Sequence, residues 1–236
     1  GVFWGSVTKV CGFKSGTRHG GKVTGLAASG NPNKLIDKFR QVIKCDGLRL
    51  KAKEELFFDS SKLIPDWGNY EPERLKKFLG EATREDVAAG AQKRLEEVAV
   101  ELISNALNKT GLNKVVLAGG VFANVLLNQK IRQLPKVDDI YVFPAMSDGG
   151  LALGAALSFL SKSKIKEGGK LMPKNFGIVY FGPSYSDNDI REDLARNKIV
   201  YKKMVEPAKE IAKLIYENKI VAFYTGRMEY GPRALG

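Results

Sequence analysis

The residues best suited to chemistry form two glycine pairs, each lying between an apolar run and an expected helix. The first pair is Gly119-Gly120 in "VVLAGGVFANVLLNQKI", and the second is Gly149-Gly150 in "FPAMSDGGLALGAAL". Glycines at a helix start leave backbone N–H groups uncovered, and such helix starts bind anions such as phosphate. Two of these turns in succession predict one nucleotide held from two sides. For each pair the alternative is a tight turn without a ligand.

Three polar side chains bear on the kind of site that these pairs could form. Asn124 follows the first pair by one turn, so it could hydrogen-bond a ribose or a base, or simply face solvent. Asp148 precedes the second pair and could ligate a cation, although position alone favours a helix N-cap. The chain has a single histidine, His19. A Ser-His-Asp triad would therefore have to use His19, and no two-histidine metal site can form from this chain alone.

Two further segments combine glycines with positively charged lysine or arginine side chains. The segment "GTRHGGKV" nearly spells a P-loop, but a valine stands where the magnesium-binding hydroxyl belongs. We therefore expect Gly21 and Lys22 to lie near a phosphate or ribose without forming a true P-loop. The segment "GRMEYGPRALG" carries Arg227 and Arg233, whose planar guanidinium groups bind phosphate and carboxylate well. The alternative for these arginines is a structural ion pair with Glu229.

The elements that position the glycine pairs can be predicted from apolar spacing and capping residues. A long helix is expected from its cap at Thr83 to Gly111, which can end it in a left-handed conformation. Residues 115–118 are apolar on both faces, which predicts a strand buried in the middle of a sheet. The other expected elements are a helix to about Gln133, a strand over 140–143 and a helix over 151–160. This alternation predicts parallel strands in an α/β layer, whose ligands bind beyond the carboxyl ends of the strands.

The C-terminal third reads as a different module. The stretch "SKSKIKEGGK" over residues 161–170 predicts a linker. A helix is expected to open at Pro207, and "KIVAFYTG" then predicts a buried strand ending in Gly226. We therefore expect a domain boundary between Ser161 and Pro207.

Composition narrows the class of protein. Among 236 residues, 44% are hydrophobic and the net charge is +12, so a globular protein with anionic partners is expected. The densest lysine stretch has no aromatic residues, which disfavours nucleic acid as the partner. No apolar run approaches the roughly 18 residues of a membrane span, and no secretory signal pattern opens the chain. Cys11 and Cys45 are far apart and predict free thiols in a reducing, cytoplasmic setting.

Together the motifs resemble one family, the O-carbamoyltransferases of the nodulation-protein and antibiotic-biosynthesis type. The matching segments are "HGGKVTGLA", "LAGGVFANVLLN", "VFPAMSDGGLALGAAL", "FGPSYSD" and "GRMEYGPRALG", in family order. The resemblance implies that residues 1–162 are the C-terminal half of an actin-like, sugar-kinase-like (ribonuclease H-like) ATPase domain. It implies that residues 163–206 are a linker and connecting segment. Residues 207–236 would begin a second, truncated α/β domain resembling threonylcarbamoyl-AMP synthase.

The resemblance also implies a reaction. The family transfers a carbamoyl group from carbamoyl phosphate, through ATP-derived carbamoyladenylate, to a hydroxyl of a small-molecule acceptor. The family's nucleotide contacts correspond to Gly119, Gly120 and Asn124 on one side and Gly149 and Gly150 on the other. Asp148 corresponds to the family's metal ligand, for a divalent ion with iron as one candidate, and Arg227 and Arg233 to phosphate contacts.

The family pattern is incomplete here. The other metal ligands are histidines in a half of the actin-like domain that this chain lacks, and Gly20 stands where members often carry an acidic residue. We therefore expect the fragment not to turn over alone. Two other readings stay open: a tRNA threonylcarbamoyladenosine-type transferase, against which "GRMEYGPRALG" argues, and a non-catalytic nucleotide-binding module.

Overall fold

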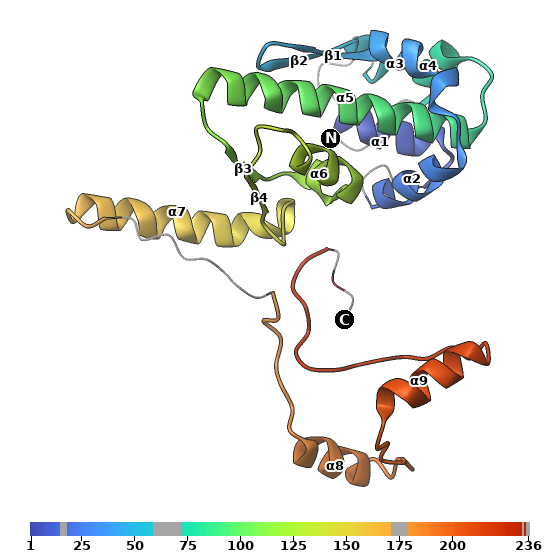
Figure 1. Cartoon of the computed structure of the whole chain (residues 1–236), viewed down its shortest axis with the longest axis vertical. Coiled ribbons are helices and arrows are strands. Elements are labelled where there is room, and N and C mark those ends of the chain that lie inside the picture. The colour runs from blue at the N-terminus through green and yellow to red at the C-terminus, as the bar shows by residue number, and fades with distance from the viewer. Residues whose placement is uncertain (15–17, 59–71, 171–178, 233, 235–236) are drawn as a thin grey trace. The chain divides into compact units, whose positions relative to one another are not determined.

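The computed structural model describes residues 1–14, 18–58, 72–170, 179–232 and 234 (Figure 1). The chain divides into two compact units, Gly1–Phe159 and Leu160–Gly236. The α-helices and strands are α1 Val2–Val10, α2 Gly20–Leu26, α3 Ile36–Val42, β1 Ile43–Asp46, β2 Arg49–Ala52, α4 Pro72–Leu79, α5 Arg84–Thr110, β3 Lys114–Leu117, α6 Val125–Arg132, β4 Asp139–Val142, α7 Leu151–Lys166, α8 Asp187–Arg196 and α9 Pro207–Tyr216. Short 3₁₀ turns are η1 Ala27–Ser29, η2 Pro32–Lys34, η3 Glu54–Leu56, η4 Gly120–Ala123 and η5 Asp148–Gly150.

The long helix α5 is the central element of the first unit, and it confirms the predicted helix. The Thr83 hydroxyl accepts a hydrogen bond from the Asp86 backbone N–H at 3.2 Å, which caps the first turn. At the other end Gly111 adopts a φ of 70°, which glycine reaches without a steric penalty. Helices α1, α2, α3 and α6 all pack on α5. The helix therefore organises most of the core.

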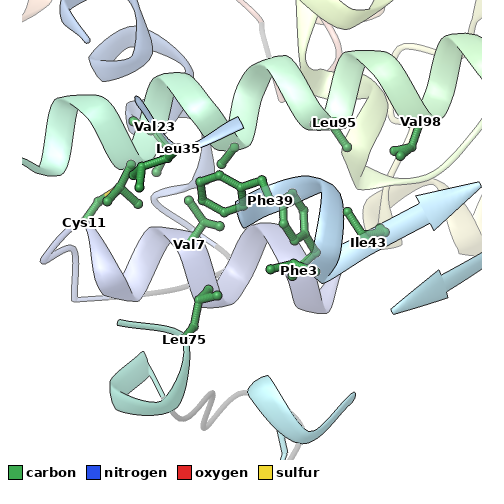
Figure 2. Close-up of a cluster of buried hydrophobic side chains, with 14 of the residues drawn as sticks. Phe3, Val7, Cys11, Val23, Leu35, Phe39, Ile43, Leu75, Leu95 and Val98 are labelled. Atoms are coloured by element: carbon green, nitrogen blue, oxygen red, sulfur yellow. The ribbon is translucent and has the colours of Figure 1, made fainter. Parts of the chain in front are cut away.

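The core of this unit forms where side chains of α1 and α3 meet beneath α5 (Figure 2). The ring of Phe3 in α1 meets the ring of Phe39 in α3 edge to face, with centroids 6.0 Å apart. Val7 of α1 and Val98 of α5 are also buried in this cluster. Each such side chain stabilises the fold by about 1.5–3 kcal/mol relative to an exposed one.

The described residues of the first unit form two separate two-stranded sheets. Strands β1 and β2 form an antiparallel hairpin, whose turn uses Gly47 at a φ of 60°. The guanidinium of Arg94 in α5 donates a hydrogen bond from Nε to the Ile43 carbonyl at 2.9 Å, which ties the hairpin to the core. Strands β3 and β4 pair in parallel, so the mixed α/β class is confirmed.

The burial predicted for the first parallel strand is only half right. Val115 and Leu117 of β3 face the core, but Val116 is 74% exposed, and Tyr141 on the paired strand is 39% exposed. Side chains alternate between the two faces of a strand, so a sheet covered on one face leaves every second side chain open. The apolar run therefore predicts the strand correctly but not the cover over its second face.

The second unit confirms one predicted helix and corrects two other predictions. Helix α9 begins at Pro207 as expected. The strand predicted for "KIVAFYTG" is wrong, because residues 219–226 form no strand and Phe223 is 65% exposed. A strand needs a hydrogen-bonded neighbour, and no described segment pairs with this one. The helix predicted over 151–160 is also longer than expected, since α7 continues to Lys166.

Helix α8 was not predicted. Its N-terminus has a capping box, in which the Ser186 hydroxyl accepts from the Asp189 N–H and the Asp189 carboxylate accepts from the Ser186 N–H.

Across the described ranges, no helix has both the length and the apolar content that crossing a membrane requires.

Candidate functional site

The two glycine pairs lie side by side because the strands that precede them are parallel. Leu117 at the end of β3 is in register with Val142 at the end of β4, so the segments that follow the two strands leave the sheet at the same edge. The backbone N–H of Gly119 then donates a hydrogen bond to the Met146 carbonyl at 2.6 Å. The turn over residues 119–124 is therefore joined directly to the loop over residues 143–150. Two segments that are separate in sequence make one surface at the carboxyl edge of the sheet.

Two of the four glycines are required by the turns themselves. Gly119 has a φ of 116°, a conformation that side-chain-bearing residues rarely adopt. A methyl group on Gly150 would collide with the carbonyl oxygen of Ala145 in the same loop. Glycine at these two positions is thus explained without a ligand, as the alternative reading of tight turns proposed.

The other two glycines are not required by the fold. A methyl group on Gly149 would have no atom within 4 Å, and one on Gly120 would meet only Ser147 Cβ at an ordinary 3.5 Å. Neither residue has a positive φ. Glycine at these positions is therefore unexplained by backbone conformation or by packing within the described residues. Close approach of another group, from a ligand or from elsewhere in the protein, is a physical reason for omitting a side chain at both.

Each pair also lies at a short 3₁₀ turn that precedes an α-helix. The turn η4 starts at Gly120 and leads into α6, and the turn η5 ends at Gly150 and leads into α7. The first N–H groups of a helical segment lack partners within it, and the helix dipole favours negative charge there. Two such segments starting from joined loops suit an anionic ligand such as a phosphate or a carboxylate.

Asn124 is buried at the junction of η4 and α6, with 6% of its surface exposed. Its side-chain oxygen accepts from the Leu127 backbone N–H at 3.2 Å, which caps α6. The same amide exchanges two hydrogen bonds with the Gln92 amide of α5. Asn124 therefore does not simply face solvent, and it shapes the turn. A direct contact with a nucleotide stays a prediction.

Asp148 is exposed at the start of η5, on the joined loops. The N-cap position belongs to Ser147, so the structure does not support the alternative that Asp148 is the cap. Within the described ranges no three His, Cys, Asp or Glu side chains gather closely enough to hold a metal ion. A divalent ion bound here would receive one carboxylate from this chain, and the remaining ligands would have to come from elsewhere. The metal stays a prediction.

The remaining predicted contacts lie on other elements. Gly21 and Lys22 are exposed in the first turn of α2, which packs on α1 and α5, and the Lys22 ammonium lies 5.9 Å from the centre of the Phe13 ring. The segment is thus a helix start, and its link to a phosphate or ribose stays a prediction. Arg227 is exposed in the second unit, and Arg233 lies outside the described residues.

The two C-terminal motifs are neighbours within the second unit. Tyr180 and Glu229 form an antiparallel bridge, and Gly182 donates from its N–H to the Met228 carbonyl at 3.2 Å. A methyl group on Gly182 would lie 2.6 Å from Met228 Cβ, so glycine is needed for this approach. The segments "FGPSYSD" and "GRMEYGPRALG" thus pack against each other, which fixes the backbone on either side of Met228.

One residue of the site was missed from sequence. Gln92 is 5% exposed in the middle of α5 and contacts Asn124 across 32 positions of sequence. The available signal was a polar side chain in an otherwise apolar stretch, "AAGAQ", because a buried amide requires partners. Nothing local identifies the partner.

Comparison with known proteins gives matches over the whole chain. The family model for the carbamoyltransferase N-terminus matches residues 1–157. The chain is 32% identical to an uncharacterised protein of Methanocaldococcus jannaschii over 242 residues, covering 100% of this chain and 38% of the relative. It is 30% identical to nodulation protein NolNO of Sinorhizobium fredii, covering 91% of this chain and 31% of that protein. Nodulation protein U of the same species is 32% identical over 67% of this chain. The chain therefore spans well under half the length of these relatives.

Proposed function

The chain belongs to the carbamoyltransferase family, and we propose that its joined glycine turns bind the nucleotide part of carbamoyladenylate. The whole enzyme would be an ATP-dependent O-carbamoyltransferase, with carbamoyl phosphate as the carbamoyl source and a hydroxyl-bearing small molecule as the acceptor. In the transfer step the acceptor oxygen forms a bond to the carbamoyl carbon, AMP leaves, and the hydroxyl proton passes to a base. This chain would contribute binding and alignment to that step.

The observation that carries the proposal is the hydrogen bond from Gly119 to Met146, which makes one surface of both turns. Gly120 and Gly149 lie on these two turns and have room for side chains that they lack. A phosphate that approaches the uncovered N–H groups would explain both facts. Asp148 on the second turn would supply one oxygen to a divalent ion, which when bound would polarise the carbamoyl oxygen as a Lewis acid.

Calorimetric titration of the 236-residue chain with AMP and with ATP tests this proposal, with and without a divalent metal. We expect both nucleotides to bind, and Asp148→Ala to weaken binding only when the metal is present. Asp139→Ala is the matched control, because Asp139 is exposed at the opposite end of β4. Folded protein that binds neither nucleotide under either condition would refute the proposal.

A separate assay addresses turnover. We expect this chain alone not to form carbamoyladenylate from carbamoyl phosphate and ATP, because it spans well under half the length of its relatives and its described residues gather no set of metal ligands. Formation of the adenylate by the purified chain would contradict that expectation. The result is independent of nucleotide binding, because a binding surface can persist without the groups that complete the chemistry.

A further inference from the structure

The buried side-chain amide of Gln92 exchanges hydrogen bonds with Asn124, which a side chain that only fills space in the core would not do. It lies on the face of α5 toward α6, in the helix on which α1, α2, α3 and α6 pack. The Asn124 side-chain N–H donates to Gln92 Oε1 at 2.8 Å, and the Gln92 side-chain N–H donates back to Asn124 Oδ1 at 3.2 Å. Burying two amides is costly unless both are paired, and here they pair with each other.

The direction of both amides is fixed from outside the pair. The Gln92 side-chain N–H also donates to the Glu96 carboxylate at 2.8 Å, and an ionised carboxylate can only accept. Gln92 must therefore turn its nitrogen toward Glu96 and its oxygen toward Asn124. At the other end, Asn124 must direct its oxygen to the Leu127 N–H. The two requirements agree, so each amide has one permitted orientation.

The series of hydrogen bonds from Glu96 through Gln92 to Asn124 ends at the candidate site. Asn124 is the last residue of the turn that begins at Gly119, and its N–H donates to the Val121 carbonyl at 3.1 Å. We propose that Gln92 is a positioning residue, which holds Asn124 and thereby fixes the backbone N–H groups of the 119–124 turn for an anionic ligand. The inference rests on the proposed nucleotide binding by that turn. It assigns a role in binding to a residue that touches no ligand.

The test compares Gln92→Leu with Val98→Ala in the 236-residue chain. Leucine is close to glutamine in size, but it leaves the Asn124 side-chain N–H without its acceptor and removes one of the two donors to the Asn124 side-chain oxygen. Val98 is 1% exposed on the same helix and belongs to the core cluster, so its truncation lowers stability through the core instead. Three readouts are recorded for each variant: the melting temperature, the Kd for AMP and the backbone amide NMR shifts.

We expect both variants to melt at a lower temperature. Gln92→Leu should also raise the Kd for AMP about tenfold, as expected for loss of a hydrogen-bonded support. It should displace the amide resonances of Gly119, Gly120 and Leu127, while Val98→Ala leaves the Kd and these resonances unchanged. If Gln92→Leu behaves like Val98→Ala in the Kd and the shifts, the role is merely structural and the inference is overturned.

The outcomes separate this inference from the proposed function. If the wild-type chain binds neither AMP nor ATP, the proposed function fails, and the amide shifts of the turn alone decide whether Gln92 positions it. If Gln92→Leu does not fold, Gln92→Met replaces it, because methionine is unbranched like glutamine but lacks the amide that bonds Asn124. Unchanged turn resonances in Gln92→Met would then overturn the inference.

Discussion

Replacing single glycines on the second turn separates a ligand-facing glycine from a structural one. Gly149→Ala adds a methyl group where no atom lies within 4 Å, at a residue without a positive φ. We expect stability to be unchanged or to rise by about 0.4–1 kcal/mol, since alanine restricts the unfolded chain. Gly150→Ala instead forces a methyl group onto the Ala145 carbonyl oxygen. Moving that backbone should cost about 1–3 kcal/mol, the usual range for overpacking.

For nucleotide binding, we expect a direct effect from Gly149→Ala, the substitution that leaves stability unchanged or higher. If a nucleotide approaches Gly149 at van der Waals distance, the added methyl group should raise the Kd for AMP at least about tenfold, or ~1.4 kcal/mol. Gly154→Ala is the matched control, because Gly154 of α7 also has no atom within 4 Å of an added methyl group but lies beyond the turn. Thermal unfolding and calorimetry measure the two effects separately. A Gly149→Ala variant that binds AMP as tightly as the wild type would refute the reasoning.

Three further predictions concern the scaffold. The pKa of Asp86 is lowered to about 2, first by the hydrogen bond from the Lys34 ammonium. The ionised Asp86 carboxylate should therefore stabilise the fold fully above about pH 4, and this stabilisation should be lost as the pH falls toward 2. Thermal melts between pH 2 and 6 should therefore be flatter for Asp86→Asn, and equal slopes would contradict this. Leu127→Ala truncates a fully buried side chain and should cost about 2–5 kcal/mol in denaturant unfolding; a loss below 1 kcal/mol would contradict this. Burial raises the pKa of the Cys11 thiol to about 11, so a thiol reagent at pH 8 should modify Cys45 alone in the native protein and both after unfolding.

Predictions that depended on neighbouring residues were the successful ones. The α5 helix follows from a cap at Thr83, apolar spacing and a terminal glycine, and all three act within a few residues. The same rules could have found α8, because Ser186 and Asp189 have the spacing of a capping box. The long connecting segment around it, with no apolar run typical of a core helix, predicts a linker instead.

Predictions that required a distant partner were the uncertain ones. The apolar run over 219–226 has strand composition but no strand to pair with in the described residues, so it stays irregular. Burial on both faces of β3 failed for a related reason, because composition does not reveal which element covers a sheet. Gln92 was missed because its partner lies 32 positions away.

The sequence by itself determined the glycine pairs, the strands and helices that flank them, and the motifs that identify the family. Only the tertiary structure decided that Gly119 bonds to Met146, that Gly150 is required by its own loop while Gly149 is not, and that Gln92 holds Asn124. Helix hydrogen bonds join residues four positions apart, so local sequence specifies them. The register of paired strands and the partners of buried amides depend on residues that are far apart in sequence, so only the folded chain determines them.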